Sequence, residues 1–272
     1  MINTKHKPLN KEDILRNISL KNYPRLSEIV ILEKTESTNN KAKNIFHKLN
    51  KNETSFCFIA EEQTSGRGTK GRKWISPHGT NIYLSLAWKS SLTLNKTDGL
   101  SLAAAVTISE ILNKELNLGM KIKWPNDLIL KGQKVGGILI ETSVKNNYLE
   151  IVVGVGLNVL MEKSYLPKIE TEWTSILYHT KEFPDRNKIA GLVLDSLLSL
   201  INNFKIYGLK YYKDTFENLN FLKGKRCQIS VENRSNLIGE VIGINKKGEL
   251  LIKMEGEILA LRSTEESIII LS

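Results

Sequence analysis

The first fifty residues alternate between helical and strand-like spacing of their apolar side chains. Over 10–20 the apolar residues recur at helical intervals, and 28–35 (EIVILEKT) has the composition of a strand. A second helix is predicted next, because Ser37 or Thr38 can cap it and apolar residues return at helical spacing over 42–49. This part of the chain therefore predicts a helix, a strand and a helix.

Two strand patterns follow and enclose a glycine-rich stretch. FCFIAEEQ (56–63) has strand composition, and TNIYLSLAW (80–88) alternates as a second strand. The next segment, 98–116, is rich in alanine and is predicted to be a core helix with Asp98 as its cap. The glycine-rich stretch is thus predicted to be a loop between two strands.

Four strand patterns then follow one another closely. They are KIKW (121–124), DLILK (127–131), KVGGILIET (134–142) and YLEIVVGVGLNV (148–159), separated by the pairs PN, GQ and NN. Turns this short favour antiparallel neighbours over parallel strands joined by helices. Residues 187–219 return to a strongly amphipathic helical pattern.

The last fifty residues consist of short strand patterns broken by NKKGE and EGE. They predict a small β-barrel, SH3-like in size and strand count, over 222–272. The whole chain is therefore predicted to be an α+β protein. Residues 1–221 would combine helices with antiparallel neighbouring strands, and the barrel would sit against them.

Charge narrows the choice of function only in part. The chain carries 39 Lys and Arg against 29 Asp and Glu, a formal net charge of +10. Such an excess fits a nucleic-acid binder, an enzyme of anionic substrates or a generally lysine-rich composition. The lysines are spread along the whole chain, and the only dense basic cluster beside glycines is SGRGTKGRKW (65–74). A dedicated nucleic-acid function is therefore disfavoured.

Other compositional features suggest an ordinary soluble protein. There is no run of about 18 apolar residues and the N-terminus is polar, so we expect no membrane association and a cytoplasmic location. Cys57 and Cys227 lack C-x-x-C spacing and are interpreted as buried free thiols.

The glycine-rich stretch matches known nucleotide loops only superficially. Gly66, Gly68 and Gly71 satisfy G-x-G-x-x-G, but a strand follows where a dinucleotide-binding turn needs a helix. A phosphate-binding P-loop would need Lys and Ser or Thr after the last glycine, where Arg72 and Lys73 stand, and no protein-kinase motif lies downstream. What remains is a loop whose backbone can approach an anion while basic side chains supply charge; a solvated basic turn fits it equally well.

Three later motifs favour a ligand site. KWPNDLIL (123–130) places Asn126 and Asp127 at a strand end, where a carboxylate could hold Mg²⁺ and an amide could read an adenine edge. KVGGILIE places Lys134 just before a glycine pair inside an apolar strand, and GVGLNV (154–159) repeats the glycine pattern. Glycines inside strands indicate the close approach of a ligand or another backbone.

In this order the motifs resemble the biotin protein ligases, that is, biotin–[acetyl-CoA-carboxylase] ligases. The matching pieces are ESTNNKA, EEQTSGRGTKGRKWISPHGTNIYLSL, KWPNDL, KVGGILIE and GVGLN, and the C-terminal region resembles the family's last domain. The resemblance implies an α+β fold with a mixed, mainly antiparallel sheet flanked by helices. This class II synthetase-like catalytic domain would span 1–221, beginning with a connector-like segment over 1–26, and an SH3-like domain would span 222–272.

The resemblance also implies a reaction and its partners. Biotin and ATP would form biotinyl-5′-AMP with Mg²⁺, and biotin would pass to a lysine of a biotin carboxyl carrier protein or domain. Lys134 and Arg67 would be catalytic, and Asp127 would hold the metal. Biotin contacts are implied for Ser37, Thr38, Asn39, Gln63, Gly66, Arg67, Gly68, Thr69, Lys134, Gly137, Gly154 and Gly156. ATP or adenylate contacts are implied for Arg67, Arg72, Trp74, Asn126, Asp127, Lys134, Asn158 and Trp173.

Two departures from the family's pattern bear on function. The usual G-R-G-R-x-G-R has Thr69 in place of its second arginine, which predicts leakage of the adenylate. Only 36 residues precede Ser37, which predicts the monofunctional class without specific DNA binding. Lipoate or octanoate ligases and transferases of the same fold, and a basic nucleic-acid-binding protein, remain as alternatives. A homodimer is compatible with the sequence, which does not fix the oligomeric state.

Overall fold

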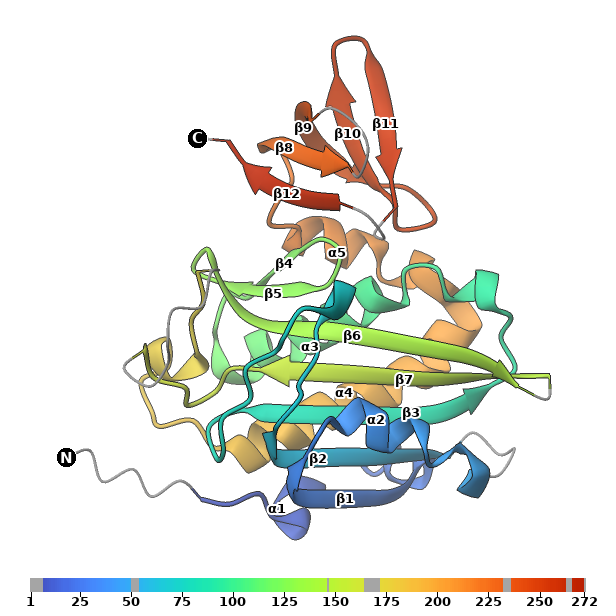
Figure 1. The fold of residues 1–272 in the computed structure, drawn as a ribbon, viewed down its shortest axis with the longest axis vertical. Helices are drawn as coiled ribbons and strands as arrows, with labels where there is room; N and C mark the ends of the chain where they lie inside the picture. The colour runs from blue at the N-terminus through green and yellow to red at the C-terminus, as the bar shows by residue number, and fades with distance from the viewer. Residues whose placement is uncertain are drawn as a thin grey trace.

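The computed structural model describes residues 7–49, 54–145, 147–163, 172–231, 236–262 and 266–271, and contains two β-sheets (Figure 1). The first part of the chain forms α1 (Lys11–Leu15), β1 (Leu26–Thr35), α2 (Thr38–Lys43), β2 (Ser55–Gln63), β3 (Ile82–Ser90) and α3 (Leu100–Leu116). It continues with β4 (Lys121–Lys123), β5 (Asp127–Leu130), β6 (Gln133–Lys145), β7 (Tyr148–Leu157), α4 (Arg186–Tyr207) and α5 (Lys213–Leu219). The last strands are β8 (Arg226–Val231), β9 (Leu237–Ile244), β10 (Leu250–Met254), β11 (Glu257–Leu261) and β12 (Glu266–Ile270).

The central sheet has seven strands in the order β1-β2-β3-β7-β6-β5-β4. All neighbouring pairs are antiparallel except β1 and β2, which are parallel. β1 and β2 are parallel because the connection through α2 returns the chain to the end of the sheet where β1 begins. The first residue of β2, Ser55, therefore pairs with the first residue of β1, Leu26. The prediction of a mixed, mainly antiparallel sheet is confirmed.

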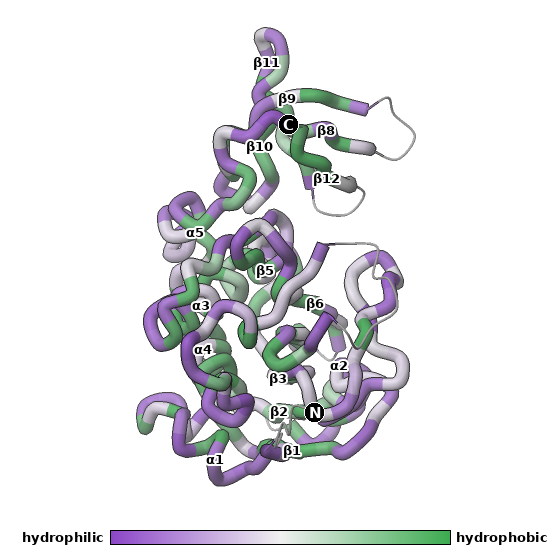
Figure 2. Tube along the Cα trace, turned by 90° about the vertical axis from the view of Figure 1, so that its left-hand side faces the viewer, coloured by the Kyte–Doolittle hydropathy of each residue, from purple (hydrophilic) through white to green (hydrophobic). Residues whose placement is uncertain are grey.

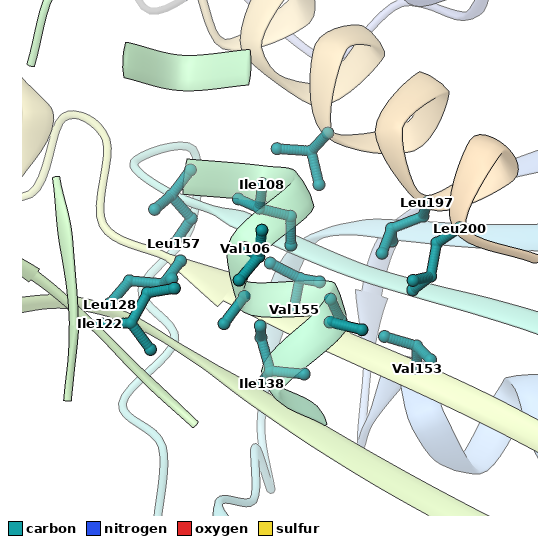
Figure 3. Close-up of a cluster of buried hydrophobic side chains, with 14 of the residues drawn as sticks. Val106, Ile108, Ile122, Leu128, Ile138, Val153, Val155, Leu157, Leu197 and Leu200 are labelled. Atoms are coloured by element: carbon teal, nitrogen blue, oxygen red, sulfur yellow. The ribbon is translucent and has the colours of Figure 1, made fainter. Parts of the chain in front are cut away.

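One face of this sheet is covered by the two long helices. Figure 3 shows Val106 and Ile108 of α3 and Leu197 of α4 gathered with Val153 and Val155 of β7. These side chains are fully or almost fully buried and belong to the main hydrophobic core. The expected cap of α3 is wrong in detail, because the N-cap is Gly99 in a left-handed conformation and not Asp98.

The other face of the sheet carries α2 and a smaller apolar cluster. Side chains alternate along β2, so that Cys57 joins the main core while Phe56 and Phe58 pack with Phe46 on the α2 face. Ser37 occupies the N-cap of α2, as predicted, but its side chain makes no capping hydrogen bond. It is therefore available for other contacts on this face.

The N-terminal segment is bound to α4 over its described part. Asn10 N donates to Asn187 Oδ1 at 2.8 Å, and the amide of Asn22 donates to Asp195 Oδ1 at 2.8 Å. The helical segment Arg186–Tyr211 is long and apolar enough to cross a membrane. However, 61% of its apolar 18-residue stretch is buried within this fold. α4 packs against α1, α3 and β3 as a core helix.

The C-terminal sheet lies beyond α5 at one end of the molecule in both views (Figures 1 and 2). Its five antiparallel strands follow the order β11-β10-β9-β8-β12, which agrees with the predicted small β domain. Trp124 Nε1 donates to Gly248 O at 2.9 Å and Ile244 N donates to Glu217 Oε1 at 2.8 Å, and these hydrogen bonds attach it to the rest of the chain. The exact boundary predicted after residue 221 stays a prediction.

Candidate active site

A cavity of about 430 Å³ opens on the α2 face of the central sheet. Seventeen of the eighteen residues predicted for the site line it; they are Ser37, Thr38, Asn39, Gln63, Arg67, Gly68, Thr69, Arg72, Trp74, Asn126, Asp127, Lys134, Gly137, Gly154, Gly156, Asn158 and Trp173. Gly66 is the exception. A Cβ there would lie 2.5 Å from Trp74 O and 2.6 Å from Ser76 Oγ, so Gly66 serves the packing of the loop base.

The strand register explains why glycines form the floor of the cavity. Gly156 of β7 pairs with Tyr83 of β3 on one side and Gly137 of β6 on the other, and Gly137 pairs with Asp127 of β5. Cross-strand partners point to the same face of a sheet, so these residues form one row. Two residues away, Gly154 pairs with Ser85 in a parallel row. The three glycines have no side chains to fill this space, so the cavity opens above them.

Neighbouring groups already approach these glycines closely. A Cβ at Gly154 would overlap Asn39 Oδ1, and a Cβ at Gly156 would lie 2.6 Å from the indole of Trp74. The indole of Trp74 therefore lies against the backbone of β7. Its Nε1 is buried and has no hydrogen-bond partner among the residues that the structure describes.

At one side of the cavity lies a group that we call the amide–hydroxyl cluster: Thr38, Asn39, Gln63, Ser76 and Ser85. Thr38 N donates to Gln63 Oε1 at 2.9 Å, and Gln63 Nε2 donates to Ser76 Oγ at 3.1 Å. The hydroxyl of Ser85, which is fully buried, lies 2.7 Å from Thr38 Oγ1 and 2.5 Å from Asn39 Oδ1. This network fixes the orientation of each amide and hydroxyl.

A second polar group, the lysine–aspartate pair, lies on β5 and β6. Lys134 Nζ is 2.6 Å from Asp127 Oδ1 and 5.5 Å from the centroid of the Trp74 ring. Next to it, Asn126 Nδ2 donates to Ile138 O at 2.7 Å. Trp74 connects the two polar groups, because its carbonyl accepts from Ser76 Oγ at 3.0 Å while its ring faces Lys134.

The segment that carries Trp173 runs alongside Lys134. Lys134 N donates to Glu172 O at 3.1 Å, and Thr174 N donates to Lys134 O at 2.9 Å. Asn158 Nδ2 donates to Thr174 O at 3.1 Å. Trp173 is thereby placed at the cavity wall. Residues 164–171, which precede this segment in the chain, lie outside the described residues.

Arg67 of the glycine-rich loop is anchored to the sheet and to α2. Its NH2 group donates to Asn40 Oδ1 at 2.6 Å and lies 3.4 Å from Glu141 Oε1. The same carboxylate is 2.5 Å from Lys43 Nζ and accepts from Asn39 Nδ2 at 2.9 Å. Burial would raise the pKa of Glu141, but these cationic and amide donors outweigh it and lower the pKa below its ordinary value.

Basic residues further along the loop contribute to the cavity rim. Arg72 and Lys73 both line it, and Arg72 NH2 donates to Thr69 Oγ1 at 3.1 Å. Lys70 has a left-handed backbone at φ 59°, which turns the loop sharply between Thr69 and Arg72. The loop thus offers cationic side chains at the opening of the cavity.

The residues present fit a magnesium ion only together with an anionic ligand. Asp127 is the one carboxylate among the described lining residues, and the described part of the chain contains no cluster of three or more His, Cys, Asp and Glu that could hold a metal. Mg²⁺ commonly binds one or two carboxylates together with substrate phosphates. Asp127 could therefore contribute one ligand to such an ion.

Several lining residues were not predicted: Lys73, Ile75, Ile138, Leu139, Val155 and Met161. The apolar members resemble every other strand residue in the sequence and give no distinct signal. Lys73 stands inside the basic stretch and could have been chosen from it. Ser85, a polar residue within the apolar stretch TNIYLSLAW, was the clearest missed signal for a buried hydrogen-bonding site.

Comparison with known proteins defines the class of protein. The model of the Biotin/lipoate A/B protein ligase family matches residues 31–158, which include both polar groups of the cavity. The bifunctional ligase/repressor BirA of Escherichia coli is 33% identical over 216 residues, covering 76% of this chain and 67% of that protein. The biotin–[acetyl-CoA-carboxylase] ligase of Mycobacterium tuberculosis is 28% identical over 202 residues, covering 73% of each.

Comparison with solved structures also indicates a biotin protein ligase. A biotin protein ligase from Aquifex aeolicus in complex with biotin and ATP superposes with a TM-score of 0.76 at 26% identity, covering 90% of this chain and all of that one. The chain belongs to the biotin protein ligases of this family and is a ligase enzyme.

Proposed function

We propose that this enzyme activates biotin with ATP and transfers it to a lysine of a biotin carboxyl carrier domain. In the first step a carboxylate oxygen of biotin attacks the α-phosphorus, the bond to pyrophosphate breaks, and biotinyl-5′-AMP forms. In the second step the lysine ε-amine attacks the carbonyl carbon, the bond to AMP breaks, and the amine loses a proton. The observation that carries this proposal is one cavity with two different polar groups joined by a glycine floor.

The amide–hydroxyl cluster suits the ureido head of biotin. A ureido group carries N–H donors and a carbonyl acceptor, and the lining residues Thr38, Asn39 and Gln63 offer fixed partners of both kinds. A substrate without this head would leave buried groups unpaired, at a cost of about 1–3 kcal/mol each. The glycine floor would accept the bicyclic ring and the chain beyond it, and the loop backbone at Gly68 would face the carboxylate.

The lysine–aspartate pair suits the reacting carboxylate and the α-phosphate. Lys134 is held beside the cavity and can stabilise negative charge as it develops during the displacement. Arg67 and Arg72 would add charge from the loop once the ligand draws it closed. Asn158 and the indoles of Trp74 and Trp173 would border the nucleotide.

Asn126 would read the adenine through its side-chain oxygen, because its amide nitrogen donates to Ile138 O. Asp127 would hold Mg²⁺, which supplies charge neutralisation for the phosphates when bound. Asp127 would have to leave Lys134 in part as it does so, and this would free the ammonium for the reacting groups.

The acceptor is proposed from the names of the relatives. The Mycobacterium tuberculosis protein and one from Paracoccus denitrificans are named biotin–[acetyl-CoA-carboxylase] ligases. The acceptor proposed for this enzyme is accordingly the biotin carrier protein or domain of acetyl-CoA carboxylase or a related carboxylase.

An exchange assay tests the first step and separates the substrates. Incorporation of labelled pyrophosphate into ATP is measured with biotin, lipoate or octanoate, and biotin alone should support exchange. Exchange with lipoate in place of biotin, or exchange without any acid, would contradict the proposal. Streptavidin detection of a purified carrier domain, and of the same domain with its acceptor lysine replaced by arginine, then tests the transfer.

A further inference from the structure

Asn81 lies between the glycine-rich loop and β3, outside the cavity, and is fully buried. Its backbone is fixed by an ion pair in the core. Arg186 and Glu61 form this pair with both side chains almost completely buried, and Arg186 also donates to Asn81 O at 3.2 Å and to Gly79 O at 2.6 Å. The backbone of Asn81 is therefore held in one position by buried hydrogen bonds.

The side chain of Asn81 fixes the turn that follows β7. Its Oδ1 accepts from Val159 N at 3.0 Å, while its Nδ2 lies 3.4 Å from Asn158 Oδ1 and 3.3 Å from Met161 Sδ. Asn158 and Met161 both line the cavity. One buried amide thus holds two wall residues that come from the same turn.

The hydrogen bonds continue from this turn to Lys134. Asn158 Nδ2 donates to Thr174 O at 3.1 Å, Asn158 O accepts from Ile176 N at 3.0 Å, and Thr174 N donates to Lys134 O at 2.9 Å. Thr174 is buried and directly follows Trp173. A continuous series of buried hydrogen bonds therefore leads from Asn81 to the Trp173 segment and to the backbone of Lys134.

We infer that Asn81 is a positioning residue for the nucleotide end of the site. It acts through Asn158 on Trp173 and Lys134, and none of its hydrogen bonds among the described residues reaches the amide–hydroxyl cluster proposed to hold biotin. The inference rests on the proposed function, which assigns those two ends to ATP and biotin. Groups held by well-packed supporting shells keep their geometry, and loss of one support changes the ligand contact beyond it.

The test compares Asn81→Ala with wild type in biotin-dependent pyrophosphate exchange, at a temperature well below the melting point of both. Loss of the buried amide should raise KM for ATP about tenfold and leave KM for biotin within about twofold. Biotin binding measured by calorimetry without nucleotide should also stay within about twofold. Asn81→Ser, which retains a small polar group, should show a smaller increase of KM for ATP.

Asn113→Ala is the matched control. Asn113 also connects two backbone segments through its side chain, accepting from Met120 N at 2.6 Å and donating to Met120 O at 3.1 Å, but it stands at the end of α3. Its replacement should lower the melting temperature without a change in either KM. A residue with a purely structural role would behave in this way.

Equal increases in both KM values, an unchanged KM for ATP, or failure of both Asn81 variants to fold would overturn the inference in favour of simple support of the fold. Absence of exchange in wild type would instead contradict the proposed function. The two failures are therefore distinguishable.

Discussion

The ammonium of Lys134 on β6 lies 2.6 Å from the carboxylate of Asp127 on β5, at the side of the cavity. Both groups are about three-quarters buried, with side-chain exposures of 23% and 24%. The proposed reaction uses both groups at this place, the ammonium beside the α-phosphate and the carboxylate on Mg²⁺. A phosphate ligand that separates Lys134 from Asp127 would make both charged groups available without moving β5 or β6.

Replacing this lysine should affect chemistry more than binding. Lys134→Ala should lower the rate of biotin-dependent pyrophosphate exchange by about 100-fold, because its charge matters mainly as the α-phosphate is attacked. The dissociation constant for biotin should change by less than about threefold. Lys145→Ala, an exposed lysine at the other end of β6, is the control and should retain exchange. Equal losses of rate and affinity in Lys134→Ala would argue against the role.

The glycine floor predicts a steric effect on biotin affinity. In Gly156→Ala the new methyl group would lie 2.6 Å from the indole of Trp74, and overpacking of this kind costs about 1–3 kcal/mol. We expect biotin affinity, measured by calorimetry, to fall by about tenfold or more.

Gly191→Ala is the control for that variant, because its methyl group would lie 2.5 Å from Ile14 O in the packing of α4 against the N-terminal segment. It should lower the melting temperature and leave biotin affinity unchanged. The same loss of affinity in both variants would show that the effect on Gly156 reflects general instability.

The buried ion pair between Arg186 and Glu61 should be important for stability. Arg186→Met would leave the carboxylate of Glu61 buried without its partner, which costs about 3–5 kcal/mol of unfolding free energy. The matched control is Lys34→Met, which removes the exposed partner of the next residue, Glu62, and should cost less than about 1 kcal/mol. Urea denaturation measures both, and similar losses would contradict the distinction.

The lowered pKa of Glu141 predicts a component of acid sensitivity. A carboxyl group with a lower pKa in the folded than in the unfolded state stabilises the fold above its unfolded pKa. This stabilisation is lost as the pH falls from the ordinary value of 4.5 through the lowered one. Glu141→Gln should therefore be less stable than wild type at neutral pH, and its free energy of unfolding should change less with pH below 4.5. Denaturation of both proteins across this range is the measurement, and parallel pH profiles would count against it.

The loop residue Thr69 gives a prediction about retention of the intermediate. It lines the cavity beside Arg72, and Thr69→Arg would add a cation at the opening. Release of free biotinyl-AMP, measured by chromatography, should decrease relative to wild type. Thr69→Gln adds length without charge and should release the adenylate as wild type does. No decrease with arginine would contradict the hypothesis of leakage.

The order of the strands over 121–157 could be predicted because short turn signals allow only hairpin connections. The parallel pairing of β1 with β2 could not be read from the apolar pattern, since it depends on how α2 crosses the sheet. Glycines at 137, 154 and 156 were informative because glycine weakens a strand interior and so indicates that another group approaches the backbone there.

The supporting residues of the site were largely invisible in the sequence. Ser85 is a single polar residue in an apolar stretch and Asn81 stands at the polar start of that stretch, and only the folded structure shows which partners they meet. The anchoring of Arg67 by Glu141 was hidden for a different reason, because the two residues are 74 positions apart. Long-range polar contacts carry no local pattern.

The hydrogen bond from Trp124 Nε1 to Gly248 O joins the C-terminal sheet to the turn that carries Asn126 and Asp127. Separating the two sheets would expose a buried indole and a buried carbonyl together. Because Asn126 and Asp127 follow Trp124 by two and three positions, we expect a substitution that displaces Gly248 to displace these two residues of the cavity wall as well, although Gly248 is not one of the lining residues.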